Sequence, residues 1–137
     1  MFDVGPPGPG HQLGHAHADH LSFELWYRGS KLICDAGNAT YTRGAARQWY
    51  RSTAAHNTVR LDGEDSLETW GAFRVGRRPK RQTGRILSSG DSTVRWAGAH
   101  DAYRHLHGSP VHERFFCMNA GGVCVLDSIS GKGEHSV

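Results

Sequence analysis

The chain has 137 residues, of which 37% are hydrophobic and 21% charged, a composition that is typical of one globular domain and excludes a disordered chain. No apolar run approaches the roughly 20 residues of a membrane-spanning helix, and the first residues lack the charged and apolar regions of a secretory signal. We therefore expect no membrane segment and no signal peptide in the chain as written. The net charge of +3 is compatible with an anionic partner. The one dense basic run, residues 77–81, is expected to be a solvated loop, so nucleic-acid binding is not indicated.

In chain order, short apolar runs with two-residue alternation predict strands separated by turns. Residues 21–27 and 31–34 are predicted to form a β-hairpin around the turn Arg28-Gly29-Ser30. Only residues 43–51 have a helix-like composition. Further strands are predicted at residues 58–61, 84–87, 93–97, 113–118 and 122–126.

Many short strands with almost no helix predict an all-β fold, an antiparallel β-sandwich. The strands that fit into this length suit half of a larger sandwich as well as a complete small one. Because a chemically dense motif stands almost at the start of the chain, we expect a partial or truncated sandwich, with residues 1–137 forming a single domain.

The cysteines indicate no functional or structural site, whereas the histidines do. The three cysteines, Cys34, Cys117 and Cys124, lack CxxC spacing, so neither a disulfide framework nor a cysteine-type zinc ribbon is indicated. Ten histidines are many for this length, and because imidazole is the commonest metal ligand, the excess indicates a functional site. Four of them have no motif to fix them and are expected at exposed strand and loop positions: His100, His105, His107 and His112.

The densest motif is residues 14–20, Gly-His-Ala-His-Ala-Asp-His, which contains the pattern HxHxDH. In an extended chain, residues two apart share a face, so His15, His17 and Asp19 can converge on one metal or one substrate. One alternative is a surface loop whose histidines bind metal only adventitiously. The small alanine spacers and the adjoining predicted strand favour a built site.

The same pattern is the ligand motif of the metallo-β-lactamase superfamily, where it supports a two-zinc hydrolytic centre. In that superfamily the motif ends an apolar strand, follows an acidic strand end and precedes a helix. Here it runs directly into a strand-like segment, and the acidic strand end at Asp35 comes after it. This alternative predicts a helix directly after His20 and a second metal.

The order of three motifs fits another family better. Residues 14–25, the triplet Asp35-Ala36-Gly37 followed by Tyr41, and the segment 51–59 with its His-Asn-Thr closely resemble the β-sandwich part of heparinase II/III-like polysaccharide lyases. The resemblance continues more weakly to the end of the chain. Such lyases carry a large N-terminal helical toroid, and we expect that toroid to be absent from these 137 residues.

The resemblance implies a zinc ion held by His17, Asp35 and His56. Two imidazoles and a carboxylate are also a normal zinc ligand set, which leaves a fourth position for water or another side chain. Because these residues are far apart in the sequence, the binding free energy of the metal would also be folding free energy, and we expect a structural role before a catalytic one. Asp19 is predicted to orient a ring nitrogen of a neighbouring histidine.

The reaction implied by the resemblance is β-elimination on an acidic, uronate-containing polysaccharide, which needs a neutralised carboxylate, a base and an acid. The resemblance implies that His15 takes the position of a substrate-contacting catalytic histidine, the alternative being a supporting residue that does not touch the substrate. Tyr41 is predicted as a second catalytic residue, with a core position as its alternative. Arg51 and Asn57 are predicted to bind substrate, the alternatives being an exposed basic helix face and a turn position.

In the resembled lyases the principal tyrosine and an asparagine come from the toroid, so the chain is expected to be incomplete as an enzyme on its own. A second hypothesis is a non-catalytic carbohydrate-binding or structural module whose metal serves stability only. The expected partners are an acidic polysaccharide and either the helical toroid or a second copy of the chain, without nucleic acid or membrane. The resemblance implies the periplasm or cell envelope as the compartment.

Overall fold

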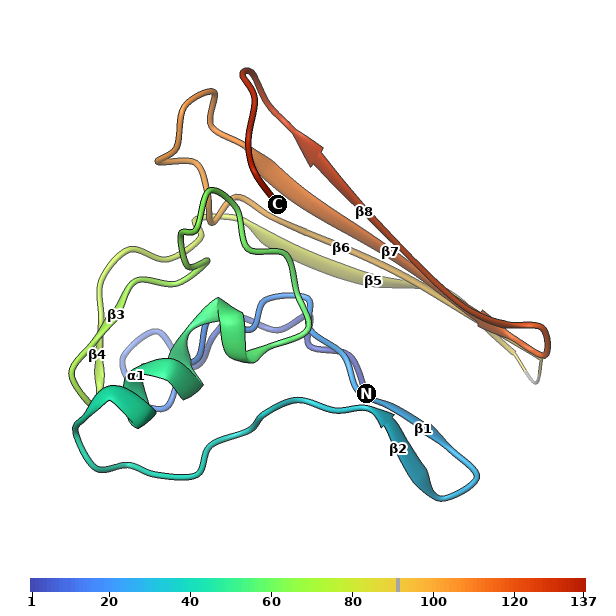
Figure 1. The fold of residues 1–137 in the computed structure, drawn as a ribbon. Helices are drawn as coiled ribbons and strands as arrows, with labels where there is room; N and C mark the ends of the chain where they lie inside the picture. The colour runs from blue at the N-terminus through green and yellow to red at the C-terminus, as the bar shows by residue number, and fades with distance from the viewer. Residues whose placement is uncertain (91) are drawn as a thin grey trace.

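The computed structural model describes residues 1–90 and 92–137, and its largest element is a four-stranded antiparallel sheet in the order β5–β6–β7–β8 (Figure 1). Every second residue of β6 from Trp96 to His100 is buried, so one face of the sheet is turned toward the rest of the chain. The four strands predicted in this region are confirmed, and each is longer than predicted. Their bounds are Gln82–Gly90 for β5, Thr93–His100 for β6, Val111–Asn119 for β7 and Gly122–Ser130 for β8.

Two small hairpins and two short helical turns form a second layer, which lies against the inner face of the sheet (Figure 1). The hairpin predicted around residues 28–30 is confirmed, but its first strand begins at Leu25, so the prediction of strand over residues 21–24 is wrong. Its turn residues Arg28 and Gly29 both have positive φ, as a tight two-residue hairpin turn requires. The bounds are Leu25–Tyr27 for β1, Ser30–Ile33 for β2, Ala45–Arg51 for α1, Thr53–Ala55 for the 3₁₀ helix η1, Thr69–Trp70 for β3 and Arg74–Val75 for β4.

One predicted strand does not form. Within residues 58–61, Leu61 alone pairs, in an isolated bridge with Glu64 around the turn Asp62-Gly63. Leu61 pairs with Glu64 across this tight turn. The apolar run therefore ends in a turn and does not join a sheet.

The inner face of the sheet is fastened to the histidine-rich segment by apolar packing. Leu21 and Phe23, directly after that segment, pack with Trp96 and Phe116 in a buried cluster. Gly98 permits this approach, because a Cβ at this position would lie 2.6 Å from Cδ2 of Leu21. The sheet therefore fixes where residues 15–19 lie.

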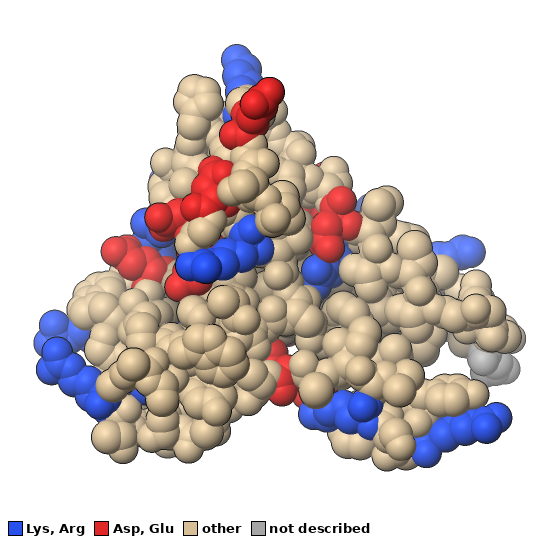
Figure 2. All heavy atoms as spheres, viewed as in Figure 1, with Lys and Arg blue, Asp and Glu red and all other residues tan. Residues whose placement is uncertain are grey.

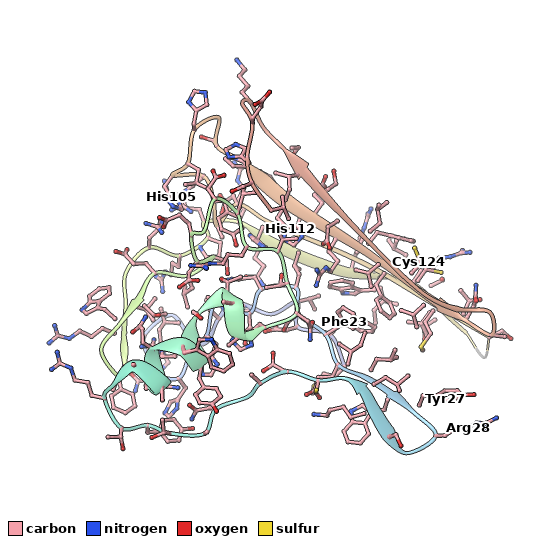
Figure 3. All side chains as sticks on the ribbon, in the orientation of Figure 1. Phe23, Tyr27, Arg28, His105, His112 and Cys124 are labelled. Carbon is pink, nitrogen blue, oxygen red and sulfur yellow. The ribbon has the colours of Figure 1, made fainter. Side chains whose placement is uncertain are left out.

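Polar groups join the same two layers. Arg114 on β7 donates a bidentate pair of hydrogen bonds to Asp127 on β8, at 2.7 and 2.9 Å, and donates to the carbonyl oxygens of Leu21 and Asn57. His112 also donates to Asp127, at 2.7 Å, and lies on the face of the sheet turned toward the second layer (Figure 3). The sheet therefore holds the ends of the segments that carry the candidate site.

The expectation that His100 and His112 are exposed is wrong. They are 2% and 0% exposed, and they form a hydrogen bond of 3.1 Å between His100 Nε2 and His112 Nδ1. They lie on the inward face of adjacent strands, where His112 reaches the carboxylate of Asp127. The expectation holds for His105 and His107.

The all-β class is confirmed, since the described residues contain mostly antiparallel strands and one short α-helix, in keeping with a β-sandwich. The helix predicted at residues 43–51 begins two residues later, at Ala45. Within the described residues, no helix is long and apolar enough to cross a membrane.

Candidate metal centre

The histidine-rich segment alternates between buried and outward-facing residues. Gly14, Ala16, Ala18 and His20 are buried, whereas His15, His17 and Asp19 face the other side. The period of two is that of extended backbone, and small alanines fit where the segment passes close to α1. The N–H of Ala18 donates to the carbonyl of Arg51 at 2.9 Å, and this hydrogen bond fixes the contact.

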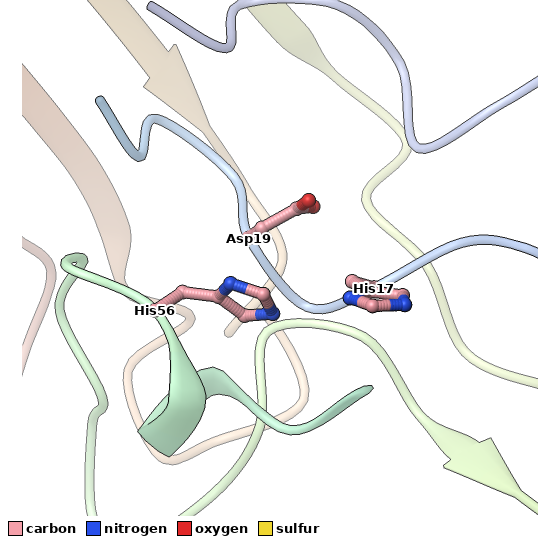
Figure 4. Close-up of side chains that lie close together, drawn as sticks. All are labelled: His17, Asp19 and His56. Atoms are coloured by element: carbon pink, nitrogen blue, oxygen red, sulfur yellow. The ribbon is translucent and has the colours of Figure 1, made fainter. Parts of the chain in front are cut away.

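His17, Asp19 and His56 lie around one space (Figure 4). Each offers one ligand atom, and the three atoms lie within 4.8 Å of one another. His56 follows η1, so the site joins the histidine-rich segment to the end of a 3₁₀ turn. Nε2 of His56 is buried and has no hydrogen-bond partner, which leaves a lone pair or a proton unused inside the protein.

Asp35 completes the cluster from another direction. Nδ1 of His56 donates to Oδ2 of Asp35 at 2.6 Å, and the second carboxylate oxygen accepts from the N–H of Gly37 at 2.7 Å. Burial alone would raise the pKa of Asp35, but these hydrogen bonds outweigh it and hold the pKa below its ordinary value. The pKa of His56 is raised, because the hydrogen bond and charge of Asp35 outweigh the effect of burial.

The other two members of the cluster have pKa values shifted toward their neutral forms. Burial, together with the nearby cationic groups of His56 and Arg47, lowers the pKa of His17 to about 4. Burial and the carboxylate of Asp3 raise the pKa of Asp19 to about 7. Burial is the largest cause of both shifts, so the cluster favours a neutral His17 and a protonated Asp19 when no further positive charge is present.

These donors fit zinc. Two imidazoles with a carboxylate are a common zinc set, and the unused Nε2 of His56 is the kind of buried atom that a metal satisfies. The resemblance predicted Asp35 as the carboxylate ligand, but the carboxylate within 4.8 Å of both histidines' ligand atoms is Asp19. Asp35 holds the far nitrogen of His56, the arrangement of a carboxylate that orients a metal-binding histidine.

Arg47 ties the surroundings of the site together. Its side chain is fully buried and donates to Oδ1 of Asn38 at 2.8 Å, to the carbonyl of Ala72 at 3.1 Å and to the carbonyl of Gly14 at 3.3 Å. It also lies 3.1 Å from Nε2 of His17. Because a guanidinium only donates, that nitrogen of His17 is unprotonated in this arrangement, and a metal bound there would compete with Arg47.

The two predicted catalytic residues lie side by side. The rings of His15 and Tyr41 meet edge to face with centroids 5.4 Å apart, and both side chains belong to exposed residues. Phe73, which sequence reasoning missed, stacks against Tyr41 with centroids 6.3 Å apart. Tyr41 is 53% exposed, so it does not take the core position that was its alternative.

The two predicted substrate-binding residues have structural partners. Arg51 is fully buried, and its Nε donates to the carbonyl of Ala16 at 3.0 Å. The side-chain amide of Asn57 accepts from the N–H of Phe23 at 2.8 Å and donates to its carbonyl at 2.7 Å. Neither side chain is placed to meet a polymer unless these contacts open.

The helix expected after His20 in the two-metal alternative is not there. Residues 21–24 turn and pair with the N-terminal segment through an isolated bridge between Phe23 and Phe2, before β1 begins at Leu25. Among the described residues, a single group of three or more candidate metal ligands is close enough to share one ion.

The comparisons with known proteins agree with the motifs. The family model for the C-terminal region of heparinase II/III-like proteins matches residues 1–137. A heparin-sulfate lyase of Pedobacter heparinus is 35% identical over 91 residues, which cover 64% of this chain and 12% of that protein. A heparin-sulfate lyase of Bacteroides stercoris is 36% identical over 59 residues, covering 40% of this chain and 9% of that protein.

An alginate lyase of Stenotrophomonas maltophilia is 26% identical over 101 residues, covering 66% of this chain and 13% of that protein. The chain thus spans about a tenth of the length of the curated relatives it matches. No solved structure matches it significantly. Since the family model covers the whole sequence, the chain belongs to the heparinase II/III-like family and corresponds to the C-terminal region of its members.

Proposed function

We propose that the chain is the metal-binding part of a lyase that cleaves uronate-containing polysaccharides by β-elimination. The observation that carries this proposal is the alternation of the histidine-rich segment, which puts His15, in ring contact with the exposed Tyr41, on the same face as His17 and Asp19 of the cluster. The names of the relatives, two heparin-sulfate lyases and an alginate lyase, support an acidic polysaccharide as the substrate class.

In β-elimination a base removes the proton next to the uronate carboxylate, a carbon–carbon double bond forms, and the glycosidic oxygen leaves with a proton from an acid. The imidazole of His15 is exposed and can hold or accept a proton at the substrate. The Tyr41 phenol beside it can donate one to the leaving oxygen. The guanidinium of Arg47 lies 5.1 Å from the Tyr41 ring centroid and keeps this side of the pair electropositive, which favours an anionic sugar.

We assign the zinc to the space between His17, Asp19 and His56, with Asp35 holding His56 in place. When bound there, zinc would supply a fixed positive charge and cross-link the histidine-rich segment to η1. The protein residues do the rest: Asp35 orients the imidazole of His56, and Arg47 positions Asn38 and the turn before Phe73.

The experiment follows the ultraviolet absorbance of the unsaturated uronate product, with heparan sulfate and alginate as separate substrates. We expect the 137-residue chain to bind the polysaccharide and to cleave it only when the helical N-terminal domain of a relative is supplied. His15→Ala should abolish cleavage and leave zinc content unchanged. Binding without product even in the presence of that domain would favour the second hypothesis, a non-catalytic carbohydrate-binding module.

A further inference from the structure

A recess lies beside the pair of His15 and Tyr41, in the turn between β3 and β4. Its volume is about 250 Å³. Phe73 lines the recess and also touches the pair, since its ring centroid lies 6.3 Å from both His15 and Tyr41. The Phe73 ring therefore lies between the recess and the candidate catalytic pair. It is lined by Arg43, Trp70, Gly71, Ala72, Phe73 and Arg74.

Large aromatic rings are exposed here. Trp70 is 44% and Phe73 51% exposed, whereas Trp96 in the sheet is 2% exposed. Other aromatic rings of the chain are also exposed, such as Trp26 at 57%, so what singles out Trp70 and Phe73 is that their exposed faces line a recess that a ligand can enter. The flat face of a pyranose ring, with its row of C–H groups, is a suitable partner for such rings.

The recess is also positively charged. Arg43 and Arg74 are exposed, and within the described residues neither guanidinium has a hydrogen bond or an ion pair. The carboxylate of Glu68 accepts from the N–H of Arg77 at 2.7 Å, and no carboxylate is among the described residues that line the recess. Figure 2 shows Lys and Arg side chains projecting at the left edge of the view, over β3, β4 and the start of α1.

The backbone of the recess is held in place before any ligand binds. Arg47 donates to the carbonyl of Ala72 at 3.1 Å, and Gln48 donates to the carbonyl of Thr69 at 2.8 Å. Gly71 has a φ of +59°, which a residue with a side chain adopts only with strain. Because the turn is already rigid, little conformational entropy is lost when a ligand binds to its rings and charges.

We propose that this recess is a subsite for an anionic sugar unit of the polysaccharide, next to the unit that meets His15. The sugar ring stacks on Trp70 or Phe73, and its carboxylate or sulfate lies between Arg43 and Arg74. The proposal rests on the proposed function and adds to it the residues that hold the neighbouring sugar unit.

The test measures the affinity of the chain for a size-defined heparan sulfate oligosaccharide by titration calorimetry, with a neutral glucan oligosaccharide of the same length as the uncharged probe. The variants are Arg43→Ala with Arg74→Ala, and Trp70→Ala. Arg28→Ala and Trp26→Ala are matched controls, because they replace an exposed arginine and an exposed tryptophan of the β1–β2 hairpin. Figure 3 shows Arg28 at the tip of that hairpin, away from α1. Circular dichroism checks that each variant is folded.

We expect the double arginine variant to raise the Kd about tenfold, with a weaker dependence on salt, since each exposed ion pair is worth up to about fivefold. Trp70→Ala should raise the Kd about fivefold. Trp70→Phe should keep most of the native affinity, because the stacking face remains. The two controls should leave the Kd unchanged.

Equal affinity of the double variant and the native chain would overturn the subsite. If His15→Ala still weakened binding in that case, the proposed function would stand without it. A native chain that binds no acidic oligosaccharide would overturn both. Loss of affinity for the neutral glucan in the arginine variant would also contradict the subsite, because charge would then not be what it recognises.

Discussion

Nδ1 of His56 lies 2.6 Å from Oδ2 of Asp35, and this hydrogen bond leaves Nε2 as the free nitrogen of the ring. The two residues are 21 positions apart, on the segment after β2 and at the end of η1. A carboxylate that holds one nitrogen of a histidine fixes the direction in which the other nitrogen can bind a metal.

The first prediction follows from this hydrogen bond. Asp35→Asn removes the charged acceptor and keeps the shape, so we expect zinc affinity to fall about 10- to 100-fold without complete loss. Competition with a fluorescent chelator measures it. Asp19→Asn should weaken binding more, because Asp19 is the carboxylate that lies with both histidines. The reverse order of the two variants would show that Asp35 is the direct ligand.

A second prediction concerns Arg47, whose buried guanidinium serves three oxygen acceptors and Nε2 of His17. Arg47→Met leaves these acceptors unpaired, and we expect the free energy of unfolding to fall by about 2–4 kcal/mol. Urea unfolding measures the change. Arg43→Met, in the exposed turn just before α1, is the control and should stay within about 0.5 kcal/mol of the native value. A similar small effect for both would mean that water replaces the Arg47 contacts.

The main strands and the shared face of the histidine-rich segment could be predicted from the sequence, because both depend on local patterns. Alternating apolar residues gave β5 to β8, and the spacing of His15, His17 and Asp19 gave a shared face. The burial of Arg47 and Arg51 could not be predicted, because it depends on carbonyls of Gly14, Ala16 and Ala72 that only the fold brings close.

Phe73 was missed for a similar reason. Its turn is held by Arg47 through Ala72, a contact between residues far apart in the sequence, and two-residue strands such as β3 and β4 leave little periodicity. A signal was present in the run Trp70-Gly71-Ala72-Phe73, where aromatic residues flank a glycine turn.

A third prediction concerns acid stability. Burial, helped by the charges of His20, His112 and Arg114, lowers the pKa of His100 well below 6.5, and burial lowers that of His20 to about 4. At these two histidines the unfolded chain therefore binds protons that the folded chain does not, so their contribution to stability is complete above pH 6.5 and falls as the pH drops below it. Asp127, whose pKa is lowered by hydrogen bonds from His112 and Arg114 despite burial, adds a further loss below pH 3.8.

Urea unfolding at a series of pH values measures this loss. For His20 alone we expect on the order of 3 kcal/mol between pH 7 and pH 4. His100→Gln should flatten the profile between these values, whereas the exposed His11→Gln should leave its shape unchanged. A His100→Gln profile with the same slope as the native one would contradict the buried neutral state of these histidines, because Asp19, with its raised pKa, contributes equally to both profiles.

A fourth prediction concerns the contact between the sheet and the histidine-rich segment. Gly98→Ala places a methyl group 2.6 Å from Cδ2 of Leu21 and 3.1 Å from the carbonyl oxygen of Thr83. We expect a loss of about 1–3 kcal/mol in the free energy of unfolding, and weaker zinc binding because residues 15–19 shift. Gly90→Ala is the matched control in the neighbouring strand, since among the described residues other than its chain neighbours no atom lies within 4 Å of its added Cβ. Equal stability of the two variants would show that Leu21 moves aside at no cost.

The central claim is that His17, Asp19 and His56 form one metal site, and the amount of bound metal tests it most directly. Elemental analysis of the chain, purified without a histidine tag, should give about one zinc ion per chain. His56→Ala should lose it, while His11→Ala, at an exposed position, should keep it. Circular dichroism with added zinc shows whether His56→Ala is still folded. About two metal ions per chain, or one that survives in a folded His56→Ala variant, would contradict the account.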